Sequence, residues 1–201
     1  NVQDASIVPV CMGSPINLRG VSNLLDDICG YFPSPDKRSC NGIAQKTNEI
    51  FEANYDFTKV KSAYVWKTIA DPFLGKYSLI KVCSGVIKSD DTLLNVEKGE
   101  EERLNKLYVL EGSKPIEVPE LHAGDIGAVT KLSGFSTGDT LCSASNVVKL
   151  DGVSVPIASY KVAVSAIKKG DEEKIASGIA RLCEEDPSLK YLSLIHISEP
   201  T

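Results

Sequence analysis

Between Lys59 and Asn146 the sequence holds a series of short β-type runs with no helical pattern between them. Turn-forming pairs such as Lys98-Gly99 and Thr137-Gly138 separate these runs. Several short strands at near-even spacing are typical of a small antiparallel barrel, which also removes exposed sheet edges. The predicted strands lie in KSAYVWKTIA, YSLIKVCSGVI, DTLLNVE, ERLNKLYVLEG, GDIGAVTKL and DTLCS.

The connection between the first two runs contains Asp71-Pro72, a turn signal, and Gly75-Lys76. Gly75-Lys76 lacks the upstream glycine and the following Ser or Thr of a phosphate-binding loop, so it is not a P-loop. Gly85, within the second run, suits a bulge or a close approach of two backbones.

The segments on either side of the β runs predict incomplete α/β elements. In residues 1–33, the apolar run SIVPVCMGS fits a buried strand, and a helix follows with Val21, Leu24 and Ile28 on one face until Pro33. One such unit cannot bury both of its faces, so we expect more of this domain upstream. In residues 147–191, the alternating run YKVAVSAI predicts a strand, and DEEKIASGIARLCEEDP predicts a helix with an acidic first turn.

Two further segments are interpreted as non-domain sequence. Residues 34–58 are polar and unpatterned, which predicts a linker that is partly ordered where Ile50, Phe51 and Phe57 can pack. LSLIHISEPT, residues 192–201, equals the translation of a sequencing-adaptor DNA, and we interpret it as an artefact rather than a short strand. His196 therefore receives no role.

Composition narrows the class of protein. The chain has 201 residues, of which 42% are hydrophobic and 24% charged, as in an ordinary soluble protein. No apolar run reaches the roughly 18 residues of a membrane helix, so we expect no membrane partner. The scattered cysteines, named below, predict a cytoplasmic protein. The net charge of −5 disfavours broad electrostatic binding of free nucleic acid but permits a shaped contact with folded RNA. The six cysteines are scattered with no CxxC, which predicts reduced, mostly buried thiols: Cys11, Cys29, Cys40, Cys83, Cys142 and Cys183.

A series of motifs, in family order, resembles bacterial elongation factor G and elongation factor G-like translational GTPases. IVPVCMGSPINLRGVSNLLDDICGYFPSP resembles the end of the GTP-binding domain. TIADPFLGKYSLIKVCSGVIKSDD, KGEEERLNKLYVL with LHAGDIGAV, and STGDTLC resemble the second domain, and GIARLCEEDPSLKY resembles the first helix of the third. The resemblance implies a mixed fold: a GTPase-domain end (1–33), a linker (34–58), a central antiparallel β-barrel, domain II (59–146), and a truncated ferredoxin-like βα unit (147–191).

The resemblance also implies a set of site residues. Gly13, Ser14 and Pro15 match the turn whose backbone N–H groups reach the guanine base, although Pro15 has no N–H to donate. No P-loop and no Asn-Lys-x-Asp occur in the sequence, so we expect no catalytic residue and no metal site here, and GTP and Mg²⁺ only in the full-length parent. The expected partner is the ribosome, both small-subunit rRNA and ribosomal proteins. The candidate RNA contacts are Lys76, Lys81, Lys88, Lys98 and Arg103.

The implied function is a fragment of a GTPase that drives translocation of tRNA and mRNA, with this fragment supplying a ribosome-docking barrel and no chemistry. Two alternatives stay open. A tetracycline-resistance ribosome-protection GTPase shares the architecture, although its second domain lacks the DPF-x-GK to TGDTLC series. A non-enzymatic β-barrel interaction module would have no ribosomal role.

Two other local features receive no functional role. We interpret Glu100-Glu101-Glu102-Arg103 as a solvated charged turn, and His122 as a loop histidine rather than a catalytic one.

Overall fold

The computed structural model describes residues 2–4, 6–34, 37, 40–71, 75–112, 114–130, 134–168 and 170–192. The chain divides into two compact units, Asn1–Arg38 and Ser39–Thr201. Pro72 of the predicted turn and residues 193–201 of the suspected adaptor tail lie outside the described residues.

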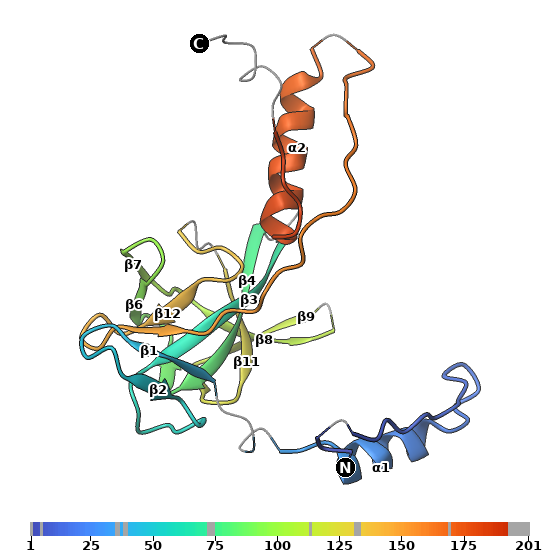
Figure 1. Cartoon of the computed structure of the whole chain (residues 1–201), viewed down its shortest axis with the longest axis vertical. Helices are drawn as coiled ribbons and strands as arrows, with labels where there is room; N and C mark the ends of the chain where they lie inside the picture. The colour runs from blue at the N-terminus through green and yellow to red at the C-terminus, as the bar shows by residue number, and fades with distance from the viewer. Residues whose placement is uncertain are drawn as a thin grey trace. The chain divides into compact units, whose positions relative to one another are not determined.

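The first unit consists of helix α1 (Val21–Tyr31) and an irregular segment before it (Figure 1). The predicted helix is confirmed, and it ends just before Pro33, as expected. The strand predicted in SIVPVCMGS is wrong, because the described part of the run is exposed and unpaired except for one bridge between Ser14 and Arg19. A strand forms only where a neighbour satisfies its backbone N–H and C=O groups, and no neighbouring strand occurs among the described residues of this unit.

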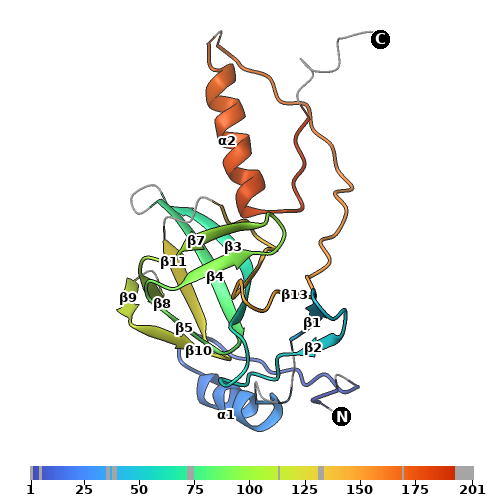
Figure 2. The ribbon, with the colours of Figure 1, turned by 90° about the vertical axis from the view of Figure 1, so that its left-hand side faces the viewer.

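Three antiparallel sheets lie in the second unit (Figures 1 and 2). The largest has eight strands in the order β7-β6-β12-β3-β4-β11-β8-β9, the second has three in the order β13-β1-β2, and the third pairs β10 with β5. The strands are β1 (Asn41–Ala44), β2 (Ile50–Glu52), β3 (Ser62–Asp71), β4 (Gly75–Ser84), β5 (Val86–Lys88), β6 (Thr92–Asn95), β7 (Glu100–Arg103), β8 (Leu107–Glu111), β9 (Lys114–Val118), β10 (Glu120–His122), β11 (Ile126–Thr130), β12 (Thr140–Cys142) and β13 (Val148–Leu150).

Every predicted β run contains a strand, but three strands in this region were not predicted. β9 and β10 lie in a stretch with little alternation. β7 is the segment Glu100–Arg103, which was interpreted as a charged turn and of which only the second half falls in a predicted run. The turn itself lies one step earlier, at residues 96–99. β7 was missed because backbone pairing with β6 needs no apolar side chain on β7.

The central β-structure is mostly antiparallel, as predicted, but the described strands do not close into a barrel. β7 and β9 are the two edges of the large sheet, and they do not pair with each other. Both edges carry features that discourage pairing with other chains. β7 has the sequence EEER, and β9 carries Pro115 beside Lys114. Charge and proline thus protect edges that barrel closure was expected to remove.

Strand β4 connects the apolar clusters of this unit because both of its faces are covered. Ile80 and Val82 point into the main core, while Tyr77 and Leu79 pack with Ala128 in a second cluster. Cys83 lies in a third cluster with Val148 and Leu150 of β13. Side chains alternate along a strand, so a strand that contacts three clusters must be central and apolar on both sides.

Gly85 confirms the close backbone approach expected there. A Cβ on Gly85 would lie 2.9 Å from the Cα of Lys61, and the residue has a φ of 72°. Next to it, Ser84 Oγ donates to the Val60 carbonyl at 2.6 Å and lies 2.6 Å from Ser62 Oγ. The start of β3 is therefore pinned to the end of β4 by buried polar contacts as well as by the sheet.

Residues 41–52, inside the predicted linker, hold strands β1 and β2 of the three-stranded sheet. Residues 39–58 are thus part of the larger unit rather than a connection to it. Phe51 packs in the third cluster, whereas Ile50 is 79% exposed and Phe57 60% exposed. The pairing of β1 with β13, about a hundred residues away in the chain, gives these polar residues their order.

Beyond β13 the chain runs without strand structure to helix α2 (Glu172–Glu185). The strand predicted in YKVAVSAI is wrong, since its apolar side chains are exposed and none of its backbone is in a sheet. The helix is confirmed, with Glu172 and Glu173 in its first turn and Pro187 following its end. A P-loop domain end and a ferredoxin-like unit are not recognisable in the described parts of these two terminal segments.

Candidate functional site

The five basic residues proposed as RNA contacts do not form one patch. They lie on β4 (Lys76 and Lys81), on β5 (Lys88), in the turn after β6 (Lys98) and on β7 (Arg103). Their surroundings differ, and these differences separate structural cations from cations that a ligand can reach.

Lys76, Lys81 and Lys98 are held within the fold. Lys76 Nζ lies 3.4 Å from a Glu184 carboxylate oxygen, and its side chain is only 22% exposed. Lys81 Nζ lies 5.1 Å from the centroid of the Tyr55 ring, and the contact with Tyr55 raises the pKa of Lys81. Lys98 Nζ donates to the Gly134 carbonyl at 2.6 Å and to Ser136 Oγ at 2.9 Å, which fastens the segment before β12.

Lys88 and Arg103 are the accessible pair. Their side chains are 62% and 66% exposed, and both lie beside the turn Ser89-Asp90-Asp91. Lys88 Nζ is 3.5 Å from Glu120, and Arg103 Nη2 is 3.0 Å from Asp90. Exposed ion pairs of this kind are weak, so a phosphate group can compete for both cations.

A third cation, Lys106, belongs to the same region and was missed from the sequence. It lines a hollow of about 340 Å³ with Ser89, Asp90, Asn105 and Glu117. Its Nζ lies 2.7 Å from Glu117 Oε2, and this hydrogen bond raises the pKa of Lys106. A single lysine between Asn105 and Leu107 carries no spacing signal. We call Lys88, Asp90, Arg103 and Lys106 the 90-turn surface.

The predicted guanine turn in the first unit is a tight backbone turn. The Ser14 N–H donates a hydrogen bond to the Arg19 carbonyl at 3.0 Å, and the Arg19 N–H donates one to the Ser14 carbonyl at 3.1 Å. The Ser14 donor is therefore engaged within the turn, and Pro15 has none. A Cβ on Gly13 would lie 2.9 Å from the Arg19 carbonyl oxygen, so the turn requires glycine there. The guanine role of Gly13, Ser14 and Pro15 stays a prediction.

Neither a catalytic histidine nor a metal centre emerges from the described residues. His122 ends β10, lies 3.0 Å from Glu120 and meets the Phe57 ring edge-on at 5.9 Å. Nowhere in the described ranges do three His, Cys, Asp or Glu side chains gather as a metal ion requires. Within the same ranges, no helix has the length and apolar character to cross a membrane.

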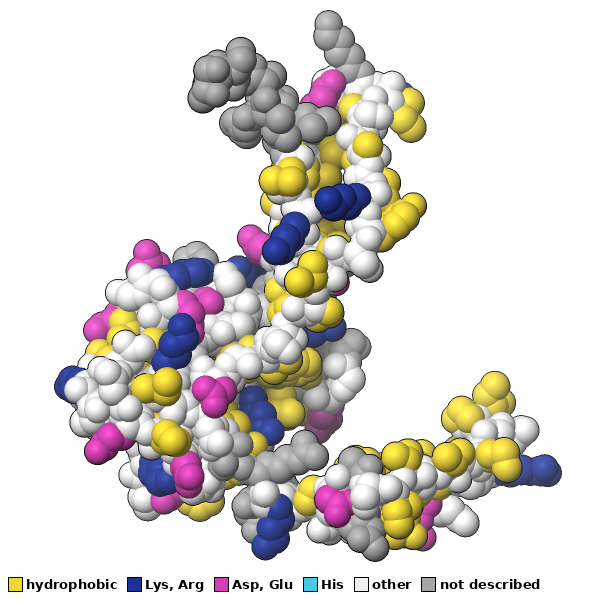
Figure 3. All heavy atoms as spheres, in the orientation of Figure 1, with side chains coloured by type: hydrophobic (Ala, Val, Ile, Leu, Met, Phe, Trp, Pro, Cys, Tyr) yellow, Lys and Arg dark blue, Asp and Glu magenta, His cyan; other side chains and the backbone are white. Residues whose placement is uncertain are grey.

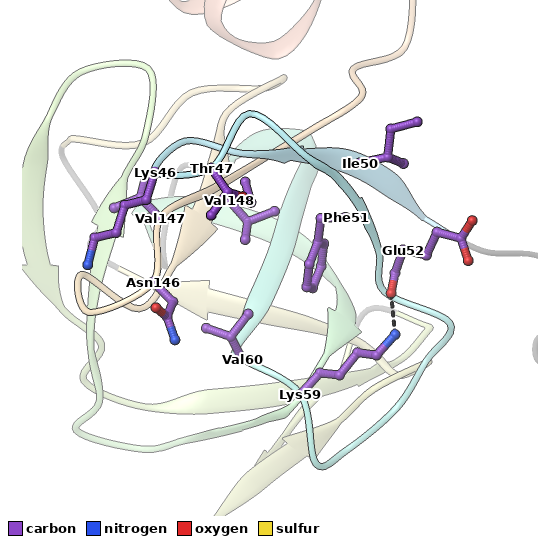
Figure 4. Close-up of a pocket in the computed structure, with 11 residues that line it drawn as sticks. Lys46, Thr47, Ile50, Phe51, Glu52, Lys59, Val60, Asn146, Val147 and Val148 are labelled. Atoms are coloured by element: carbon purple, nitrogen blue, oxygen red, sulfur yellow. Dashed lines mark hydrogen bonds between the residues drawn. The ribbon is translucent and has the colours of Figure 1, made fainter.

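An open groove of about 610 Å³ lies beside the three-stranded sheet (Figure 4). Phe51, Val60 and Val148 give it an apolar floor. Its two lysines are occupied by the fold, because Lys59 donates to the Glu52 carbonyl and Lys46 to the Ser145 carbonyl. The groove therefore offers mainly apolar surface, with both of its lysine ammonium groups engaged.

Comparison with known proteins shows what the central sheet is similar to. Residues 61–144 match the family model described as elongation factor G domain 2. This central region is therefore similar to domain II of a translation factor. The matched range contains β3 to β12, all five predicted RNA contacts and the whole 90-turn surface. Elongation factor G is a translational GTPase, so the match supports a translation factor over an unrelated interaction module.

A solved structure is similar over a longer range. The crystal structure of a protein from Thermus thermophilus, designated ttk003000868, superposes with a TM-score of 0.68 at 29% sequence identity. The likeness covers 90% of this chain and 25% of that protein. The chain thus spans about a quarter of the length of the Thermus protein.

Proposed function

We propose that the chain is part of an elongation factor G-like GTPase that acts on the cytoplasmic ribosome in translocation of tRNA and mRNA. In this proposal the domain II region docks on small-subunit rRNA and ribosomal proteins. The match of residues 61–144 to elongation factor G domain 2 carries it. The antiparallel sheet built by those residues supports it.

GTP hydrolysis belongs, in this proposal, to a part of the parent protein other than these 201 residues. The sequence contains no P-loop to hold phosphates and Mg²⁺ and no Asn-Lys-x-Asp to hold guanine. The purified chain is expected to bind labelled GTP no more tightly than about 1 mM and to release no phosphate. Micromolar binding in equilibrium dialysis would contradict this assignment.

Exposed apolar side chains support the view that both terminal segments pack on further structure. In the first unit, Val8, Val10 and Ile16 are at least 75% exposed, and α1 has no buried residue (Figure 3). Between β13 and α2, Ile157, Tyr160 and Ile167 are at least 84% exposed. Contiguous apolar surface of this kind usually marks an interface. A GTP-binding domain and a third domain are the partners we propose.

The 90-turn surface is the part of domain II that we propose for phosphate contact. It presents three cations, Lys88, Arg103 and Lys106, each paired with a carboxylate side chain that is at least 37% exposed. Folded RNA is recognised largely through its backbone and shape, which suits a few cations on a rigid turn. Lys76, Lys81 and Lys98 are instead proposed as supports of the fold.

The test replaces the three cations with glutamine in the 201-residue chain and measures binding to small ribosomal subunits. Loss of phosphate contacts should weaken binding about tenfold or more and lower the salt slope by about one per contact. A matched triple variant, with glutamine at Lys67, Lys149 and Lys174, changes net charge equally away from this surface. Equal affinities of the two triple variants would contradict the docking assignment. Thermal melting of both should stay near that of the wild type.

A further inference from the structure

Two of the six cysteines lie together where the three-stranded sheet packs on β4. Cys83 is buried on β4, and Cys40, directly before β1, is half-buried in the same apolar cluster. Both side chains contact this one cluster, and each thiol shifts the pKa of the other. The expectation that the cysteines are mostly buried is wrong, because only Cys83 and Cys142 are buried.

Two polar side chains, Tyr55 and Lys81, lie near Cys40, the more exposed thiol of this pair. Cys40 Sγ lies 3.5 Å from Tyr55 Oη, and Lys81 lies over the Tyr55 ring at 5.1 Å. Lys81 and Cys83 are two apart on β4 and share a face. A phenol and an ammonium group beside a thiol stabilise its ionised form, because one donates a hydrogen bond and the other supplies positive charge.

The backbone that carries Tyr55 is held in an unusual conformation. Asn54 and Tyr55 have φ values of 51° and 50°, in the left-handed region that residues with a Cβ rarely occupy. The Ala53 N–H donates to the Cys40 carbonyl at 3.0 Å, so this strained segment is tied directly to the thiol pair. Strain of this kind persists where the surroundings fix it, and it often lies at functional sites.

The two thiols differ in their ionisation. The hydrogen bond from Cys83 lowers the pKa of Cys40, and Tyr55 and the charge of Lys81 lower it further. The same hydrogen bond and burial raise the pKa of Cys83. Cys40 is also the more accessible of the two sulfurs, so it is the one whose ionised form is favoured and the one that a peroxide can reach.

We propose that Cys40 and Cys83 are a redox-active pair, in which a hydroperoxide oxidises Cys40 and Cys83 then closes an intramolecular disulfide. The Cys40 thiolate attacks the outer oxygen of the hydroperoxide, and the O–O bond breaks to give a sulfenic acid and an alkoxide or hydroxide that takes a proton. The Cys83 sulfur attacks the sulfenic sulfur, and its proton leaves with the hydroxyl as water. Two thiols and one hydroperoxide thus give one disulfide, one water and one alcohol or water.

The disulfide would fasten the three-stranded sheet to the large sheet. Cys40 precedes β1, which pairs with both β2 and β13, and Cys83 lies in β4. A covalent link here removes unfolded conformations and any sliding between the two sheets. This inference is independent of the ribosomal role, because neither thiol belongs to the 90-turn surface.

The first experiment treats the reduced 201-residue chain with one equivalent of hydrogen peroxide and maps its peptides by mass spectrometry. The expected product is a single chain with Cys40 joined to Cys83 and a melting temperature several degrees above that of the reduced chain. In Cys83→Ser, Cys40 should instead be trapped by dimedone as a sulfenic acid. A disulfide of Cys40 with Cys11 or Cys29, or no disulfide at all, would overturn the proposal.

The second experiment does not depend on the buried Cys83 variant. Iodoacetamide labelling between pH 5 and 9 should show Cys40 reacting about threefold faster at pH 7 than the exposed Cys29, since the larger thiolate fraction is partly offset by lower nucleophilicity. Tyr55→Phe and Lys81→Met, which remove the groups facing Cys40 besides Cys83, should move its profile to higher pH. Cys29 in the same samples is the control. A Cys40 profile unmoved by both substitutions would contradict their positioning role.

Discussion

Helix α1 and strand β4 are both rich in apolar residues and have similar lengths, eleven and ten residues, but only β4 is buried. α1 buries no residue, and Leu24, Leu25 and Ile28 on its apolar side are 41–57% exposed. β4 buries both faces among three clusters. The difference teaches that a periodic pattern predicts which side of an element is apolar, whereas a partner surface decides whether that side stabilises anything.

The largest expected difference between α1 and β4 is in the protection of their backbone amides from hydrogen exchange. An isolated helix of eleven residues is marginal in water, so amides of α1 should be protected less than about tenfold. Amides in the paired centre of β4 should be protected by about a thousandfold or more, because their exchange requires global unfolding. Exchange measured by NMR on the 201-residue chain checks this. Equal protection of the two segments would mean that α1 has found a partner surface.

The next largest effect is expected from a core truncation. Phe135 is fully buried in the main cluster, and Phe135→Ala should lower the free energy of unfolding by about 3–5 kcal/mol through lost burial and an unfilled cavity. Ile28→Ala in α1 is the matched control and should leave the main unfolding transition unchanged. Urea unfolding followed by Trp66 fluorescence measures both. A large effect of Ile28→Ala would show that the units unfold together.

Much of the central fold could be predicted because its information is local. Alternation in the runs around Val65, Ile80 and Val129 marks strands, and Gly85 marks a close approach that the structure confirms. β1 and β2 could not be predicted, because their polar residues are ordered by pairing with β13 far along the chain. Closure of the barrel was predicted from strand spacing, which does not determine whether the edge strands pair.

The candidate site was predictable only in part for a similar reason. The charge of Lys88 and Arg103 is visible in the sequence, but so is that of Lys76 and Lys98, and only the fold shows which cations are occupied by Glu184 or the Gly134 carbonyl. Lys106 was missed because its relation to Asp90 depends on the path of two turns. Cys40 and Cys83 meet through sheet packing, which no Cys spacing indicates.

Alanine substitutions at two glycines compare a backbone position that is packed against another backbone segment with one that is open to solvent. Gly85 and Gly99 have nearly equal φ values of 72° and 73°, but only Gly85 has backbone atoms within 4 Å of an added Cβ. Gly99→Ala should cost about 1 kcal/mol for the left-handed conformation alone. Gly85→Ala should cost about 2 kcal/mol or more, since β3 must also move. Thermal unfolding measures the loss of stability in both variants. Equal losses would show that the start of β3 can move away from an added Cβ at little cost.

The smallest expected effect is a gain in stability rather than a loss, and it concerns a buried hydroxyl of β4 that makes no hydrogen bond within the described part of the chain. Ser78 is 1% exposed, and its Oγ has no hydrogen-bond partner among the described residues. A buried unsatisfied hydroxyl is unfavourable, so Ser78→Ala should raise the free energy of unfolding by up to about 1 kcal/mol. Ser84, on the same strand, contacts Ser62 Oγ and the Val60 carbonyl, and Ser84→Ala should instead destabilise by about 1–2 kcal/mol. Chemical denaturation resolves the two signs. Destabilisation by Ser78→Ala would reveal water or a partner at this point of β4, and the strand would then be less completely covered than its contrast with α1 requires.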